Sequence, residues 1–160
     1  MSGDYAALVG RVQQALADLE RVVSRAESLM DKAQHSADDG YLDGVALNLH
    51  GFYVGIERIF EDIAREVEAS VPSGPDWPQD LLLQMSAEVA AVRPAVITQE
   101  TRHCLGDYRA FRHVVRNVYA FNLQAARLKE LTGELRTCYQ AVCRDVTAFT
   151  SFLEQLTQPR

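Results

Sequence analysis

The sequence has few cysteines, and their spacing matches no common metal or disulfide motif. The three, Cys104, Cys138 and Cys143, form no CxxC pair. Structural zinc sites use closely spaced cysteine and histidine pairs, and small disulfide frameworks use even numbers of cysteines. We therefore expect neither zinc nor a disulfide framework. All three side chains are expected to be small buried hydrophobic groups in a reducing compartment.

The sequence also lacks an overall positive charge and any long apolar segment. The formal charge of the 160 residues is −6, so the chain does not coat nucleic acid through a general basic character, and any RNA or DNA contact must be local. No apolar run approaches the length of a bilayer span, and the start "MSGDYAALVG" lacks the basic flank and apolar core of a secretory signal. We expect a cytoplasmic protein without membrane association.

Apolar residues at helical spacing dominate what is present, and no strand pattern or internal repeat competes with them. The segment "SVPSGPDWP" (70–78) combines three prolines with a glycine and is expected to be a loop, with Pro78 in the first turn of the next helix. Thr98 is a plausible N-cap for a fourth helix, and Thr101 a weaker one. The pattern predicts an all-α, up-and-down bundle of about five helices. The expected helices cover about 4–35, 42–67, 78–89, 98–119 and 128–156.

Positive charge is concentrated in one part of this acidic chain. Residues 101–129 contain six basic side chains and one acidic one, a net +5, which leaves −11 for the rest. On a helix, the polar residues of this segment fall within an arc of roughly 160°. We expect its valines to pack on the bundle and its polar face to point outward as an anion site, because guanidinium groups match phosphate oxygens. The face consists of Arg109, Arg112, His113, Arg116, Asn117 and Tyr119.

A structural explanation of the same arginines is available. Arginines on a helix face are most often solvated or paired with neighbouring acids. The second predicted helix offers such partners in Glu57, Glu61, Asp62 and Glu66.

Three other features are interpreted as structural. His103 beside Cys104 resembles part of a cysteine nucleophile site, but no base and orienting group are evident. Glu57 and Glu61 lie one helical turn apart, as in di-iron bundles, but the Glu-x-x-His motif is absent. His50 has no partner that the sequence identifies.

The basic segment resembles the signature of the HEPN superfamily, in particular the HepT-like ribonuclease toxins. Their motif reads Arg, four to six residues, His, one residue, Tyr. Here Arg112, "HVVR", Asn117, Val118 and Tyr119 match every position except one, since asparagine replaces histidine. The segments "LGDYRAF" and "LNLHGFYVGIERIFEDIA" are also similar in character to this family, so the resemblance covers roughly residues 41–156. Because 160 residues can bury one core and hardly a second, we expect a single HEPN-like helical domain over residues 1–160.

The resemblance further implies a function. HepT-like toxins typically act as homodimers, cleave RNA without metal or other cofactor, and pair with a nucleotidyltransferase antitoxin that in some systems modifies the motif tyrosine with AMP. By position, Arg112 would hold the scissile phosphate and Asn117 would occupy the catalytic place. Tyr119 would be the candidate modification site, with Arg109 and Arg116 as further phosphate-binding residues.

The asparagine leaves the chemistry open. Metal-free RNA cleavage needs a base, an acid and a cation, and histidine exchanges protons near neutral pH whereas an asparagine amide does not. One alternative is that His113 supplies the imidazole, toward Arg112 or Arg116 of the partner subunit. Another is a catalytically degenerate module that binds RNA, nucleotide or a partner protein through its arginines. A third is a helical scaffold unrelated to RNA.

Overall fold

The computed structural model describes residues 4–117 and 124–157, without the side chains at positions 116 and 117. Within these ranges the chain forms five helices and no strand, which confirms the all-α bundle. No helix in this part of the chain is long and apolar enough to cross a membrane. The helices are α1 (Ala6–Gln34), α2 (Gly40–Val67), α3 (Trp77–Met85), α4 (Gln99–Asn117) and α5 (Ala125–Thr157).

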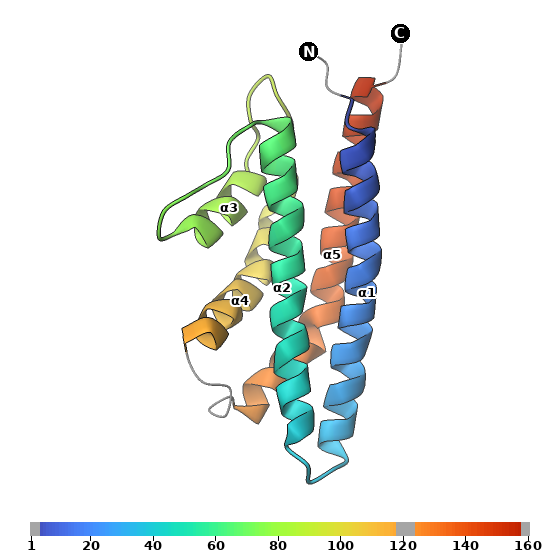
Figure 1. The fold of residues 1–160 in the computed structure, drawn as a ribbon, viewed down its shortest axis with the longest axis vertical. Helices are drawn as coiled ribbons and strands as arrows, with labels where there is room; N and C mark the ends of the chain where they lie inside the picture. The colour runs from blue at the N-terminus through green and yellow to red at the C-terminus, as the bar shows by residue number, and fades with distance from the viewer. Residues whose placement is uncertain (1–3, 118–123, 158–160) are drawn as a thin grey trace.

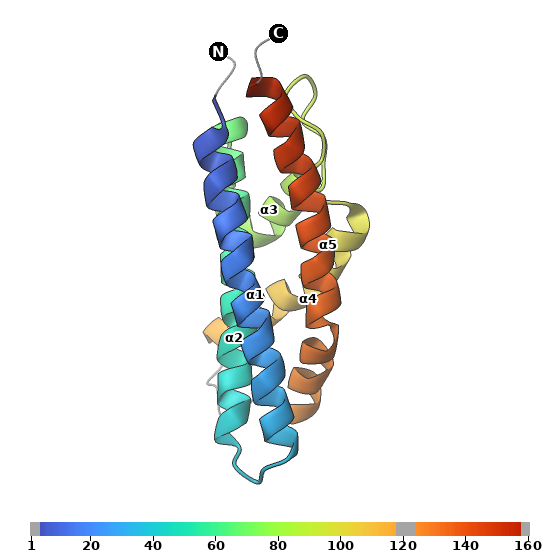
Figure 2. The same ribbon diagram turned by 90° about the vertical axis from the view of Figure 1, so that its right-hand side faces the viewer.

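The three long helices, α1, α2 and α5, lie side by side along the long axis of the molecule (Figures 1 and 2). The start of α1 and the end of α5 lie at the same end, and the α1–α2 turn lies at the other. Glycine allows α1 and α2 to approach closely, since a Cβ added to Gly55 would lie 2.7 Å from a Leu19 methyl carbon. The predicted apolar stripes form one core, with Val23, Leu49 and Ile56 fully buried.

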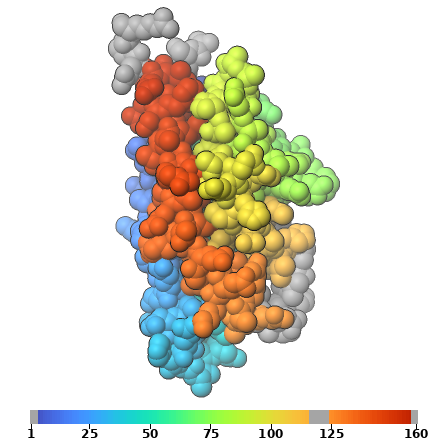
Figure 3. All heavy atoms as spheres, turned by 180° about the vertical axis from the view of Figure 1, so that it is seen from behind, coloured from blue at the N-terminus to red at the C-terminus, as the bar shows by residue number. Residues whose placement is uncertain are grey.

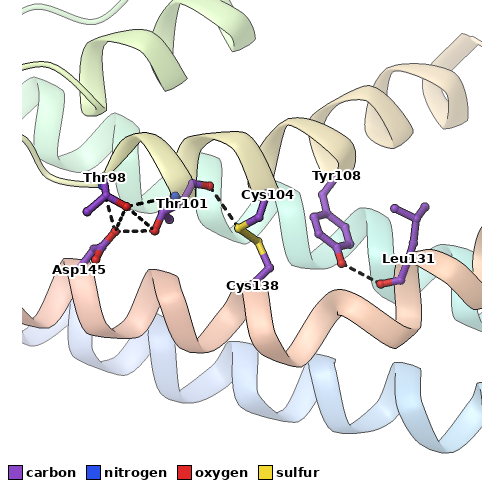
Figure 4. Close-up of a disulfide and its surroundings, with 7 residues drawn as sticks. All are labelled: Thr98, Thr101, Cys104, Tyr108, Leu131, Cys138 and Asp145. Carbon is purple, nitrogen blue, oxygen red and sulfur yellow. Dashed lines mark hydrogen bonds between the residues drawn. A yellow bond between two sulfur atoms is a disulfide. The ribbon is translucent and has the colours of Figure 1, made fainter.

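The fourth helix crosses α2 (Figure 1) and lies beside α5, as the yellow part of α4 and the orange-red α5 show in Figure 3. Thr98 is its N-cap, as predicted, because the Thr98 hydroxyl accepts the Thr101 backbone N–H at 3.1 Å. Asp145 of α5 accepts both the Thr98 N–H and the Thr101 hydroxyl (Figure 4). Burial would raise the pKa of Asp145, but these two hydrogen bonds and the neighbouring Arg144 outweigh it, so the pKa is lowered.

The third helix is shorter than predicted, since it ends at Met85 and not near Val89. The Met85 carbonyl accepts the backbone N–H groups of Val96 and Ile97, so the following loop folds back on the end of the helix. Arg93 in this loop is fully buried, and its guanidinium binds Glu68 at the end of α2 and three backbone carbonyls. The apolar spacing continues past Met85, but the chain leaves the helix there and forms a loop that is held by the contacts of the buried Arg93.

The prediction of three unpaired cysteines is wrong. Cys104 of α4 and Cys138 of α5 form a disulfide, with their Cα atoms 5.9 Å apart (Figure 4). This separation lies within the range that a disulfide spans. An odd cysteine count does not prevent one pair, and Cys143 remains a free thiol. Cys138 is buried as expected, whereas Cys104 and Cys143 are only half-buried.

Candidate functional site

The basic helix α4 does not point its whole polar face outward, contrary to expectation. Phe111 is buried and Val115 is partly buried against the core, as expected, but Val114 is 43% exposed, so the expectation for the valines does not hold for Val114. The Arg112 side chain is only 13% exposed. The stripe that faces the bundle runs through Leu105, Tyr108, Phe111 and Arg112, at spacings of three and four residues. Arg112 therefore belongs to the inner face of α4.

A buried carboxylate makes this position possible for a guanidinium. Arg112 Nε lies 2.7 Å from Oε1 of Glu57 on α2, and Glu57 is 2% exposed. A buried charge is tolerated when it is paired with an opposite charge, and Glu57 and Arg112 are such a pair. The structural explanation, pairing of the arginine with an acid of the second helix, is thus confirmed for Arg112.

The sequence named Glu57 as one of four acids that could pair with these arginines, and the structure shows that it contacts the central arginine of the motif. Its sequence position contained the relevant signal. Glu57 lies between Tyr53, Ile56 and Phe60 in the buried stripe of α2. An acid within an apolar stripe requires a partner from another element, and Arg112 is that partner.

Two aromatic side chains complete the surroundings of Arg112. Its guanidinium carbon lies 5.6 Å from the ring centroid of Trp77, the first residue of α3, within the range of a cation–π contact. Burial, and then the Glu57 charge, raises the pKa of Tyr53, while Arg109 and Arg112 act in the opposite direction. Tyr53 is therefore a neutral phenol throughout the physiological pH range.

Two adjacent pockets lie between α3 and α4. The first, of about 260 Å³, is lined by Arg109, Arg112 and His113 on one side and by the start of α3 with the residues before it on the other. The second, of about 320 Å³, shares Gln79 and Arg109 with the first and extends to His103. We call the first pocket the α3–α4 site. Its lining residues are Pro75, Asp76, Pro78, Gln79, Arg109, Arg112 and His113.

The structure thus brings together three of the predicted site residues. Arg109 is half-buried, Arg112 is mostly buried, and His113 is exposed at the pocket. Asn117 is the last residue of α4, but its side chain and that of Arg116 are outside the description. Tyr119 lies outside the described residues, so its role as a modification site stays a prediction.

Other chemistry has less support in the described residues. No group of three or more His, Cys, Asp or Glu side chains there could hold a metal ion. Cys104 is half of a disulfide and has no thiolate to act as a nucleophile. His103 lines the second pocket and not the α3–α4 site.

The α3–α4 site combines two guanidinium groups and an imidazole with one carboxylate, that of Asp76. Two guanidinium groups can bind a phosphate through several N–H donors. A guanidinium has five such donors, so the Nε contact of Arg112 with Glu57 does not use them all. His113 adds an imidazole, the side chain that serves most often in general acid–base catalysis.

Within the described residues the fold is a five-helix bundle, and its fourth helix contains most of the basic segment. A family model described as "HepT-like protein" matches residues 44–153, close to the span over which the motif and its flanking segments resemble that family. The chain belongs to the HepT-like family. Neither the curated proteins nor the solved structures contain a significant match.

Proposed function

We propose that this chain is a metal-independent endoribonuclease of the toxin type, acting in the cytoplasm. The observation that supports this best is the grouping of Arg109, Arg112 and His113 around one pocket within the family segment. Cleavage of RNA needs positive charge for the phosphorane and an imidazole for proton transfer. The α3–α4 site contains both.

The residues of the basic segment have separate roles in this proposal. Arg112, oriented by Glu57 and Trp77, holds the scissile phosphate. Arg109 adds a second cation at the pocket that Arg112 and His113 also line. His113 takes the proton of the 2′-hydroxyl, and the resulting imidazolium can protonate the leaving 5′-oxygen. Asn117 orients the phosphate through its amide, because that group does not titrate near neutral pH.

The proposal includes two partners besides RNA. HEPN-type proteins commonly act as dimers, and a homodimer would place the α4 helix of one subunit near that of the other. A nucleotidyltransferase antitoxin would control the toxin, with Tyr119 as the residue that receives AMP.

A specific observation favours a second candidate function, a catalytically degenerate HEPN dimer that binds RNA, nucleotide or a partner protein. Asparagine replaces the motif histidine at position 117. In addition, the Arg112 charge is already opposed by Glu57, so the site can bind a phosphate without being organised for a transition state.

Cleavage of total cellular RNA and tRNA by the purified protein in EDTA tests the proposal. We expect wild type to cut, and Arg112→Ala and His113→Ala to lose about 10²-fold or more of the rate. Arg25→Ala is the matched control, because Arg25 is an exposed cation on α1 and lies outside the α3–α4 site.

The second candidate function gives a different result in the same assay. Wild type would be inert while Asn117→His cuts, since that substitution restores the motif histidine. A contaminating nuclease would be revealed by equal cleavage from wild type, the alanine variants and the control. If wild type and Asn117→His are both inert and neither binds RNA, the proposed function is wrong.

A further inference from the structure

The disulfide lies in the row of contacts that joins α4 to α5. Cys104 bonds to Cys138 between two other attachments, the Asp145 cluster at the start of α4 and the Tyr108 hydroxyl, which donates to the Leu131 carbonyl at 2.7 Å (Figure 4). These attachments all lie in the first half of α4. Arg112 follows Cys104 by eight residues, about 12 Å along the helix. The disulfide is therefore the covalent part of the support on which the α3–α4 site depends.

The bond is accessible from outside. Both cysteines line an open pocket of about 740 Å³ between α4 and α5. Cys104 is half-buried, whereas Cys138 is only 3% exposed. Cys104 is thus the more exposed residue of the pair, and attack by a thiol on its sulfur makes the Cys138 sulfur the leaving group. Attack on the accessible sulfur determines the course of thiol–disulfide exchange.

We propose that the Cys104–Cys138 bond is a reversible thiol–disulfide exchange site for a dithiol reductant, and that its opening loosens α4 and so regulates the α3–α4 site. A thiolate of the dithiol attacks Cys104 Sγ, forming a mixed disulfide and releasing Cys138 as a thiolate that takes up a proton. The second thiol of the reductant then attacks the mixed disulfide. The reductant then leaves as a cyclic or intramolecular disulfide, and Cys104 is released as a thiol. Two electrons have thus passed from the reductant to the cysteine pair.

The fold has a place for the reduced sulfurs. Cys104 Sγ lies 3.2 Å from the Thr101 backbone carbonyl. A disulfide sulfur has no proton, but the reduced thiol can donate one to this carbonyl, one turn earlier on the same helix. Cys138 is in the apolar core, where a neutral thiol packs as a small hydrophobic group. Reduction therefore leaves no charged group buried.

The third cysteine is not suited to replace either partner. Burial, with a contribution from Glu20, raises the pKa of the Cys143 thiol above its ordinary value, although the Tyr139 hydroxyl opposes this shift. Cys143 thus stays protonated near neutral pH and is a poor nucleophile. It also provides a matched control, because it lies on the same helix as Cys138 but outside the disulfide.

The regulatory consequence rests on the proposed function, whereas the exchange itself does not. Disulfides of proteins in a reducing cytoplasm are usually transient, catalytic or redox-sensing. In the oxidised protein, α4 is held to α5 and Arg112 stays against Glu57. In the reduced protein, only non-covalent attachments remain, so local opening of α4 becomes more frequent.

Thiol labelling of the full-length protein tests the exchange. After equilibration in buffers of graded dithiothreitol ratio, the protein is denatured and alkylated, and labels are counted by mass spectrometry. We expect one label in oxidising buffer, three in reducing buffer, and zero and two for Cys143→Ser. Three labels on wild type in oxidising buffer, or reduction only after denaturation, would overturn the proposal.

Hydrogen exchange tests the loosening of α4 without any RNA. We expect amides of residues 105–115 to exchange roughly tenfold faster in the reduced protein and in the Cys104→Ser/Cys138→Ser variant. Oxidised Cys143→Ser should match oxidised wild type. Equal exchange in both redox states would show that the bond does not control α4. RNA binding is then measured in both states, and absence of binding in both would contradict the proposed function while leaving the exchange result intact.

Discussion

The structure contains two buried glutamate–arginine pairs, which differ in how completely the donors of the arginine are occupied. Arg93 is 0% exposed at its side chain, and its guanidinium binds both Glu68 oxygens and three backbone carbonyls. Arg112 is 13% exposed, contacts Glu57 through Nε, and also lines a pocket. The first arginine is enclosed by its own fold, whereas the second faces a space that a ligand can enter.

The difference separates a structural ion pair from a candidate binding group. The Arg93 donors are directed at the loop after α3 and at the end of α2, so no ligand can recruit them without unfolding that loop. Arg112 is fixed on one edge by a carboxylate and on one face by Trp77. Preorganisation of this kind is what a phosphate-binding arginine requires.

The largest expected effect is the loss of stability in Arg93→Met. The substitution keeps the length of the side chain but leaves Glu68 as an unpaired buried charge and the loop carbonyls without donors. We expect the free energy of unfolding to fall by about 3–5 kcal/mol, measured by urea denaturation. Adding Glu68→Gln should restore part of the loss. A loss below about 1 kcal/mol would show that this pair does not organise the loop.

Neutralising the two carboxylates should separate the pairs by function. Glu57→Gln removes the charge that opposes Arg112 and keeps the shape of the side chain. We expect affinity for single-stranded RNA at low salt to increase several-fold, and the slope of log K against log salt to steepen by about 0.7, as for one added phosphate contact. Glu68→Gln is the control and should lower stability without changing the slope. Weaker binding by Glu57→Gln with an unchanged slope would instead mean that the positioning of Arg112 by Glu57 contributes more to RNA binding than its opposing charge removes.

The helices were predictable from the sequence, because a period of 3.6 residues is local information. The apolar stripes of α1, α2 and α5 fall on the buried faces that the structure describes, and the Thr98 cap was readable from residue type. The end of α3 was not, since the apolar spacing continues beyond Met85. The loop there is determined by Arg93 and Glu68, which are 25 residues apart.

The candidate site was predictable in composition but not in orientation. The motif identified Arg112 and His113 as neighbours on one helix, which the structure places at one pocket. It did not show that Arg112 faces inward, because that depends on Glu57, which follows from the packing of two helices distant in sequence. The bond between Cys104 and Cys138, across 34 residues, depends on the same kind of information.

A smaller effect should appear in the pH dependence of stability. The pKa of Asp145 is lower in the folded chain than its ordinary value of 3.8, because Thr98, Thr101 and Arg144 stabilise the carboxylate. The unfolded chain therefore binds the proton first, so this contribution is complete above about pH 5 and is lost as pH falls below about 4. Asp145→Asn should lower stability by roughly 1–2 kcal/mol at pH 7 and flatten the acid limb of the curve. If the free energy of unfolding falls equally for variant and wild type as the pH is lowered, Asp145 does not contribute to the acid dependence of stability.

The smallest effect concerns an arginine that makes many hydrogen bonds but is only partly buried. Arg136 of α5 bonds to Glu20, Ser24 and Glu27 of α1, and its side chain is 35% exposed. If the number of bonds determined stability, Arg136→Ala would match Arg93→Met. Because exposed ion pairs contribute little and are screened by salt, we expect only a slight fall in the urea midpoint that disappears at high salt. A large, salt-independent fall would mean that bond number, and not enclosure, distinguishes Arg93 from Arg112.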